Sequence, residues 1–116
     1  MEFKLTNDRN GGSLRGYFTC APSALIKLFG HGVESDGYKV STEWTFIGTN
    51  GNEFSLYDWK RTNLYDDPEA PSPEELMEQP LLTFHIGGVN DPTEFSEWLQ
   101  TKIDGKFSKD FPKEYI

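Results

Sequence analysis

Three side chains in this sequence could carry out acid–base chemistry: Glu43, Asp58 and His85. The turn signal Asn50-Gly51 predicts a hairpin over residues 38–61, and a loop of two or four residues centred there sets Glu43 directly opposite Asp58. Like charges that face each other across two strands destabilise a sheet, so water at an exposed strand end, a cation or a partner's arginine must compensate. If His85 lies near this carboxylate pair, an acid–base cluster forms; otherwise His85 is a hydrogen-bonded structural residue at a strand end.

A second group of residues could bind a ligand through aromatic rings. Trp44, Tyr57 and Trp59 fall on the hairpin, and Lys60 and Arg61 follow them directly. Rings with adjacent cations can stack on a nucleobase and pair with a nucleotide. The alternative is that these rings form the core beneath the helices.

The glycine pair Gly87-Gly88 lies between an expected strand and an expected helix, an arrangement that can bind phosphate through backbone N–H groups. Asp91 and Glu94 fall in the first turn of that helix, where they would satisfy these donors themselves and repel an anion. We therefore expect a plain capped helix there.

The single cysteine, Cys20, precedes another expected helix, where a thiolate would be stabilised, and His31 or His85 could pair with it. A buried and inert thiol is the expected outcome. Because one cysteine cannot form an intramolecular disulfide, the chain suits a reducing compartment.

The predicted register places apolar side chains on both faces of the hairpin. Trp44 faces Tyr57 on one side, and Ile47 faces Phe54 on the other. A two-layer domain needs only one apolar face per hairpin. The second face must therefore be covered by the chain's own helices or form a binding surface, which would also allow a homodimer.

Local signals predict the remaining elements. Ser72-Pro73-Glu74-Glu75 is a capping box with proline at the first helical position, so a short helix begins there and ends at Pro80. After Asp91-Pro92, apolar residues recur at helical spacing as far as Ile103. The sequence predicts strands near residues 3–5, 14–19 and 81–86, and helices over residues 22–29, 73–79 and 91–103.

This order of elements indicates one α+β domain over residues 1–105. We expect a small antiparallel sheet of three to five strands, with the hairpin 38–61 at its centre, packed against two or three helices. Residues 106–116 are expected to form a polar C-terminal tail that docks loosely or stays mobile.

The charge of the chain restricts its partners. The net charge is −8, and residues 64–116 contain only four basic residues. This composition argues against direct binding to a nucleic-acid backbone, and no apolar run approaches the ~18 residues of a membrane span. Residues 64–79 contain acids and no base, so they form either a solvated surface or an acidic patch for a basic partner. The acids of this segment are Asp66, Asp67, Glu69, Glu74, Glu75 and Glu78.

The sequence also carries a family pattern, with YKVSTEWTF at residues 38–46, FSLYDWKRTNLYD at 54–66 and HIGG at 85–88. This pattern resembles a family of small uncharacterised proteins of bacteriophages and other large DNA viruses. The resemblance covers residues 29–103 and departs at Leu82-Thr83-Phe84-His85, where a further aromatic residue would be expected before the histidine. It implies a small viral accessory protein in the cytoplasm of an infected host cell, and it supplies no catalytic residues.

Three hypotheses about function follow. The first is a non-enzymatic protein that binds and inhibits a host protein through its acidic patch. The second is a nucleotide-sequestering protein that uses the hairpin rings together with Asp58, Lys60, Arg61 and His85. The third is a small hydrolase-like enzyme with Glu43, Asp58 and His85, in which Asp58→Asn would leave folding intact and abolish activity. No nucleophile or metal signature is recognisable, so we assign no catalytic residue, metal or cofactor.

Overall fold

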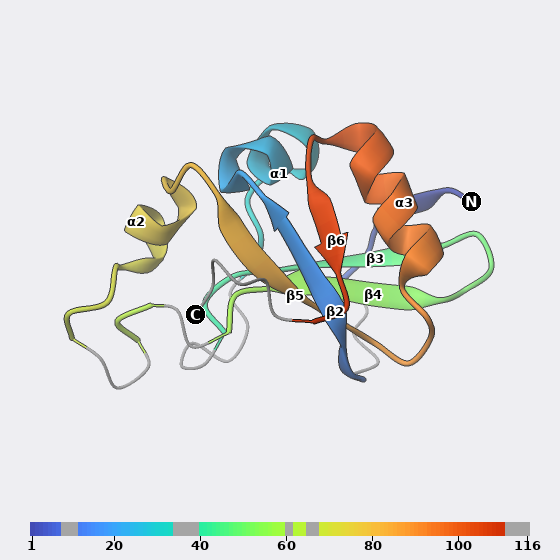
Figure 1. Cartoon of the computed structure of the whole chain (residues 1–116), viewed down its shortest axis with the longest axis horizontal. Coiled ribbons are helices and arrows are strands. Elements are labelled where there is room, and N and C mark those ends of the chain that lie inside the picture. The colour runs from blue at the N-terminus through green and yellow to red at the C-terminus, as the bar shows by residue number, and fades with distance from the viewer. Residues whose placement is uncertain (8–11, 34–39, 60–61, 65–67, 111–116) are drawn as a thin grey trace.

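The computed structural model describes residues 1–7, 12–33, 40–59, 62–64 and 68–110. It has a six-stranded antiparallel sheet in the order β1-β3-β4-β5-β2-β6, with three helices (Figure 1). The α+β class predicted from the sequence is therefore confirmed. The elements are β1 (Phe3–Leu5), β2 (Ser13–Cys20), α1 (Pro22–Phe29), β3 (Glu43–Gly48), β4 (Glu53–Tyr57), α2 (Pro73–Met77), β5 (Leu82–Gly88), α3 (Thr93–Lys102) and β6 (Lys106–Ser108).

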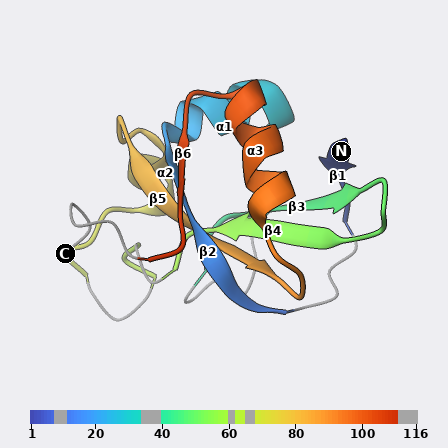
Figure 2. The ribbon, with the colours of Figure 1, turned by 45° about the vertical axis from the view of Figure 1, so that its right-hand side comes forward.

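Helices α1 and α3 lie on one face of the sheet, and α2 lies at one end of the molecule (Figures 1 and 2). The core forms between the sheet and these helices, because α3 turns Phe95 and Leu99 inward and α1 contributes Leu25, all fully buried. Phenylalanine rings dominate this core, and Phe54 stacks on Phe95 with ring centroids 5.0 Å apart. Helices α1 and α3 do not cover the other face of the sheet, so that face is one place where a site can form.

The hairpin loop closes differently from the prediction. The Gly48 carbonyl accepts from the Gly51 N–H at 2.9 Å, and the Gly48 N–H donates to the Asn52 carbonyl at 2.8 Å. These bonds define a three-residue loop over residues 49–51, whereas the sequence predicted a loop of two or four. Gly51 has a φ of 87°, the left-handed conformation that a three-residue hairpin loop requires at this position.

The odd-numbered loop shifts the register of β3 and β4 by one residue. Glu43 lies opposite Tyr57, and Trp44 lies opposite Leu56, so the predicted pairs Glu43–Asp58 and Trp44–Tyr57 are wrong. A shift of one residue moves every side chain of a strand to the other face of the sheet. The large apolar side chains now share one face, and the predicted apolar second face is instead mostly polar. The core face carries Trp44, Phe46, Phe54 and Leu56, and the other face carries Glu43, Thr45, Ile47, Glu53, Ser55 and Tyr57.

Two further predictions need correction. Lys106–Ser108 form β6 and pair with β2, so the sheet has six strands and extends past the predicted boundary at residue 105.

The pair Gly87-Gly88 continues β5 rather than ending it, because both glycines pair with β4. A Cβ at Gly88 would lie 2.9 Å from the Phe54 ring, so only glycine fits there. Residues 111–116 of the predicted tail lie outside the described residues.

Candidate functional site

The polar face of the sheet gathers hydrogen-bonding side chains from neighbouring strands. The Thr45 hydroxyl donates to Glu43 Oε2 at 3.3 Å and lies 3.2 Å from the Ser55 hydroxyl. Glu43 and Thr45 are both buried, although they lie on the face opposite the helices. Breaking a hydrogen bond inside a buried network costs more free energy than breaking one at an exposed site. The network therefore holds these side chains in place.

Next to this network, His85 lies among three aromatic rings. The Tyr17 ring is edge-on to the imidazole at 5.0 Å between centroids, the Tyr57 ring lies at 5.5 Å, and the Trp59 indole stacks on it at 6.3 Å. His85 is only 5% exposed, whereas Trp59 is 36% exposed. We call these four residues the His85 ring cluster. The structure therefore brings together three of the predicted ligand-binding residues: Tyr57, Trp59 and His85.

Tyr57 connects the ring cluster to Glu43, its cross-strand neighbour. Burial raises the pKa of the Tyr57 phenol, and the negative charge of Glu43 and the nearby Tyr17 raise it further. The phenol therefore stays protonated at neutral pH and can act there only as a hydrogen-bond donor or acceptor.

Asp58 has a different role from the predicted one. Its carboxylate is 1% exposed and accepts hydrogen bonds from the Ser41 and Thr42 N–H groups, both at 2.8 Å, and from the Ser41 hydroxyl. These bonds tie the end of β4 to the segment that leads into β3. Asp58 is a structural anchor, and the predicted pairing of two carboxylates does not occur.

Trp44 also differs from the prediction, because it belongs to the core. Its side chain is 2% exposed, its indole N–H donates to the Gly30 carbonyl at 2.9 Å, and its ring contacts Phe84. It therefore lies on the opposite face of the sheet from the His85 ring cluster. Lys60 and Arg61, the predicted cations, lie outside the described residues.

Cys20 is fully buried in the core, and burial raises the pKa of its thiol to about 12. A thiol that stays protonated is a poor nucleophile, so no cysteine chemistry is assigned. His31 lies on the exposed surface after α1.

The described part of the predicted acidic patch lies on the surface around α2. Glu69, Glu74, Glu75 and Glu78 are exposed, while Asp66 and Asp67 lie outside the described residues. The capping box is present as predicted: Ser72 Oγ accepts from the Glu75 N–H at 3.2 Å, and Glu75 accepts from the Ser72 N–H at 3.1 Å. The hydrogen bond from the Ser72 N–H, followed by the Ser72 side chain, lowers the pKa of the Glu75 carboxyl, so it carries its charge at neutral pH.

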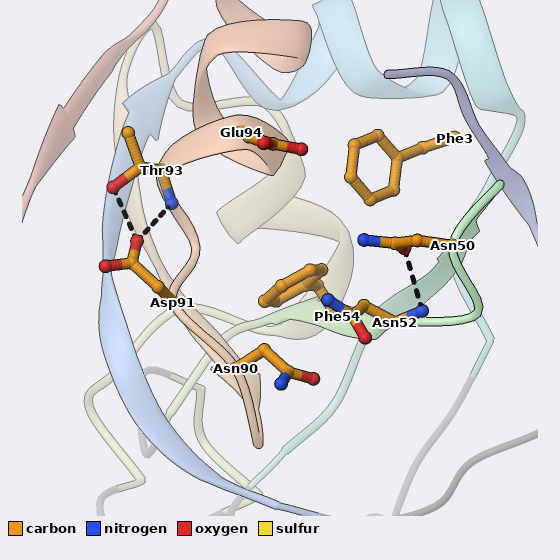
Figure 3. Close-up of a pocket in the computed structure, with 8 residues that line it drawn as sticks. All are labelled: Phe3, Asn50, Asn52, Phe54, Asn90, Asp91, Thr93 and Glu94. Carbon is orange, nitrogen blue, oxygen red and sulfur yellow. Dashed lines mark hydrogen bonds between the residues drawn. The ribbon is translucent and has the colours of Figure 1, made fainter.

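A hollow of about 480 Å³ opens where the hairpin loop meets the N-terminus of α3 (Figure 3). Phe3 and Phe54 contribute apolar surface to it, and Asn50, Asn52 and Asn90 contribute amides. The sequence analysis missed this hollow, because the asparagines come from two separate turns and no short motif connects them. The one available signal was Asp91 with Glu94, which were interpreted as helix caps.

Within the described ranges, no group of three or more His, Cys, Asp or Glu side chains could hold a metal ion. Among the same residues, no helix has the length and apolar character to cross a membrane. No protein-family model matches this sequence, and no curated protein is significantly similar to it. The resemblance to viral proteins therefore stays a prediction.

Proposed function

We propose that this protein is a small acidic viral accessory protein that binds a host protein and inhibits it without catalysis. The acidic patch around α2 would make the electrostatic contact with a basic surface of the host protein. The observation that supports this proposal is the exposure of Glu69, Glu74, Glu75 and Glu78 on a segment that contains no basic residue.

The described part of the patch is held by contacts of α2 with the rest of the molecule. Leu76 is 2% exposed and anchors α2 in the core, while the capping box orders the first turn. The Asn63 N–H donates to the Pro71 carbonyl at 2.8 Å and so connects the two ends of the preceding loop. A patch that is ordered before binding loses less conformational entropy when the partner docks.

Exposed leucines flank the acidic segment. Leu81 is 64% exposed and Leu64 is 38% exposed. Protein interfaces combine apolar contacts with a polar rim, and complementary charge mainly speeds association and selects the partner. The patch and its flanking leucines have both components.

The test is capture of partners from infected-host lysate with the tagged protein, at low and at high salt. We expect a stoichiometric host protein that is lost at high salt, because exposed charge pairs are screened. Glu74→Gln with Glu78→Gln should weaken this capture, because each exposed ion pair with the partner contributes about 0.2–1 kcal/mol. Neither residue belongs to the capping box of Ser72 and Glu75, so the box stays intact. Glu97→Gln with Asp104→Asn removes the same charge from exposed positions around α3 and should leave capture unchanged. Capture that neither salt nor the α2 substitutions weaken would rule out the proposed contact.

A nucleotide-binding function is the second candidate, and the His85 ring cluster supports it. Trp59 is partly exposed beside Tyr57 and His85, as a base-stacking platform would require. Nucleotides should then quench tryptophan fluorescence in the wild-type protein but not in Trp59→Phe. Trp44 and Trp98 are buried on the core face, so their fluorescence serves as an internal control.

A further inference from the structure

Strand β1 forms an open edge of the sheet. It is the first strand in the order of the sheet, and among the described strands it pairs with β3 alone. An open edge presents backbone N–H and C=O groups that can pair with a further strand. In Figure 1, β1 and α2 lie at opposite ends of the molecule, so a contact through β1 does not depend on the function proposed for the acidic patch.

The hydrogen bonds to β3 determine which backbone groups of β1 point outward. The Glu2 carbonyl accepts from an N–H of the hairpin loop at 3.1 Å, and the Thr6 N–H donates to a carbonyl of β3 at 2.9 Å. In an antiparallel pair, residues that bond to the neighbouring strand alternate with residues that do not. The even-numbered residues therefore bond toward β3, and Phe3 and Leu5 direct their N–H and C=O groups toward the open side.

The side chains along this edge alternate between the two faces of the sheet. Phe3 is buried in the core, while Leu5 and Met1, which have the same parity, are 43% and 50% exposed. Glu2 and Lys4 have the opposite parity, and both are exposed. Within the described ranges, neither of these charged side chains has a hydrogen bond or an ion pair. The edge therefore offers an acid, a base and two apolar groups to whatever pairs with it.

The charges on this edge are complementary to those of a second copy of the same strand. Two identical strands can pair antiparallel about a two-fold axis, which repeats every contact. If Phe3 faces Phe3 of the second copy, Glu2 faces Lys4 on both sides of the axis. If Phe3 faces Leu5 instead, Lys4 faces Lys4, and like charges directly opposite each other destabilise the pair. If Leu5 faces Leu5, Lys4 faces Thr6 and no opposite charges meet.

The register that pairs the charges also pairs the other groups of the edge. The outward N–H and C=O of Phe3 meet the same two groups of the second copy, so each N–H can donate to the opposite carbonyl. On the helix side of the sheet, Leu5 faces Met1 of the second copy, which brings together apolar side chains that are exposed in the monomer. Backbone, charge and apolar contacts therefore all favour this register.

We propose that two copies of this protein associate through β1, with Phe3 opposite Phe3 and Glu2 opposite Lys4, so that the two sheets join into one. Because β1 has three residues, the contact is small. Small interfaces form weak and reversible complexes, so we expect a Kd on the order of 0.1–1 mM.

The test begins with a dilution series of the untagged full-length protein across this range of concentration. Backbone amide NMR signals of Phe3 and Leu5 should shift with concentration, and their hydrogen exchange should slow, because these N–H groups gain partners only in the dimer. The Lys4 N–H bonds toward β3, so it should exchange slowly at every concentration. Sedimentation should show the average mass rising toward twice that of the monomer.

Charge reversal tests the register. Lys4→Glu and Glu2→Lys should each weaken association at least tenfold, because the two-fold axis repeats each like-charge pair. Mixing these two variants should restore it, since every pair between the unlike copies is again acid against base. Lys106→Glu makes the same charge change at an exposed position of β6, the opposite edge strand, and should associate like the wild type. Because Glu2 and Lys4 are exposed, thermal midpoints of the dilute variants should match that of the wild type.

Three results would overturn the proposal. The first is an absence of concentration dependence at Phe3 and Leu5, and the second is a mixture of the two variants that associates no better than either alone. The third is stronger association of Lys4→Ala, because the lysine would then be a charge that keeps the edge from pairing. Weakening by Lys106→Glu equal to that by Lys4→Glu would likewise contradict a contact through β1.

Discussion

Asp58 shows how a single buried carboxylate can organise backbone rather than chemistry. Its Oδ1 atom accepts from two consecutive N–H groups, of Ser41 and Thr42, and Ser41 is itself buried. Two donors that converge on one acceptor fix the direction in which the chain enters β3. The anchor holds the two residues that directly precede Glu43 and β3.

The anchor predicts different effects for two substitutions of Asp58. In Asp58→Asn the remaining oxygen can keep both N–H bonds, and the Ser41 hydroxyl can turn to accept from the new NH₂ group. In Asp58→Ala both donors lose their partner, which costs roughly 1–3 kcal/mol beyond the asparagine variant. Urea unfolding measures this difference as a change in midpoint at constant slope. Equal losses in the two variants would show that the hydrogen bonds to Ser41 and Thr42 contribute nothing.

Tyr57 predicts how stability depends on alkaline pH. The ordinary pKa of its phenol is 10.0, and burial, Glu43 and Tyr17 raise the folded-state value. Protonated Tyr57 therefore favours the folded state: its contribution is complete below pH 10.0 and is lost as the pH rises toward the folded-state pKa. Tyr57→Phe should flatten this alkaline loss of unfolding free energy. An unchanged alkaline profile in the variant would assign the loss to other groups.

At the scale of elements, the hairpin loop determines which face of the sheet is polar. Gly51 is the residue that allows a three-residue loop, because it adopts a positive φ at low cost. A Cβ at this position would meet nothing within 4 Å, so a substitution would be strained only through its backbone conformation.

Gly51→Ala should therefore destabilise the protein by about 1 kcal/mol, and Gly51→Asn by less, because asparagine tolerates the left-handed region better. Thermal unfolding of the two variants beside the wild type measures both losses. If asparagine cost as much as alanine, a contact rather than the backbone conformation would be responsible.

Elements with local signals were predictable from the sequence, and the pairing between them was not. Pro22, the Ser72–Glu75 capping box and the spacing of Phe95 and Leu99 predicted three helices that the structure contains. The register failed because Asn50-Gly51 fits loops of two, three or four residues, and a local sequence does not choose among them. The site predictions that depended on the register failed with it, as the Glu43–Asp58 pair shows.

At the scale of the whole molecule, the acidic segment around α2 and the hollow at the hairpin loop lie at opposite ends of the molecule (Figure 1). The polar face was unpredictable because Tyr17, Tyr57 and His85 come from three strands that pair only in the folded state. The hollow was unpredictable for the same reason. Its lining comes from Phe3, the hairpin loop and the segment around Asp91, which lie far apart in the sequence. What the sequence did indicate correctly was the fold class.

The position of β2 in the sheet determines the order in which the molecule can assemble. This strand precedes β3, β4 and β5 in the sequence, yet it pairs with β5 and β6, and the Thr19 hydroxyl contacts the Thr83 hydroxyl although the two residues are 64 positions apart. Such distant pairing makes loop closure the slow event, which places folding of sheet-rich domains in the millisecond-to-second range. During synthesis, β2 therefore cannot complete its pairing until residues 82–108 have left the ribosome, and Phe18, which is fully buried in the folded protein, has no strand of β5 or β6 beside it before then.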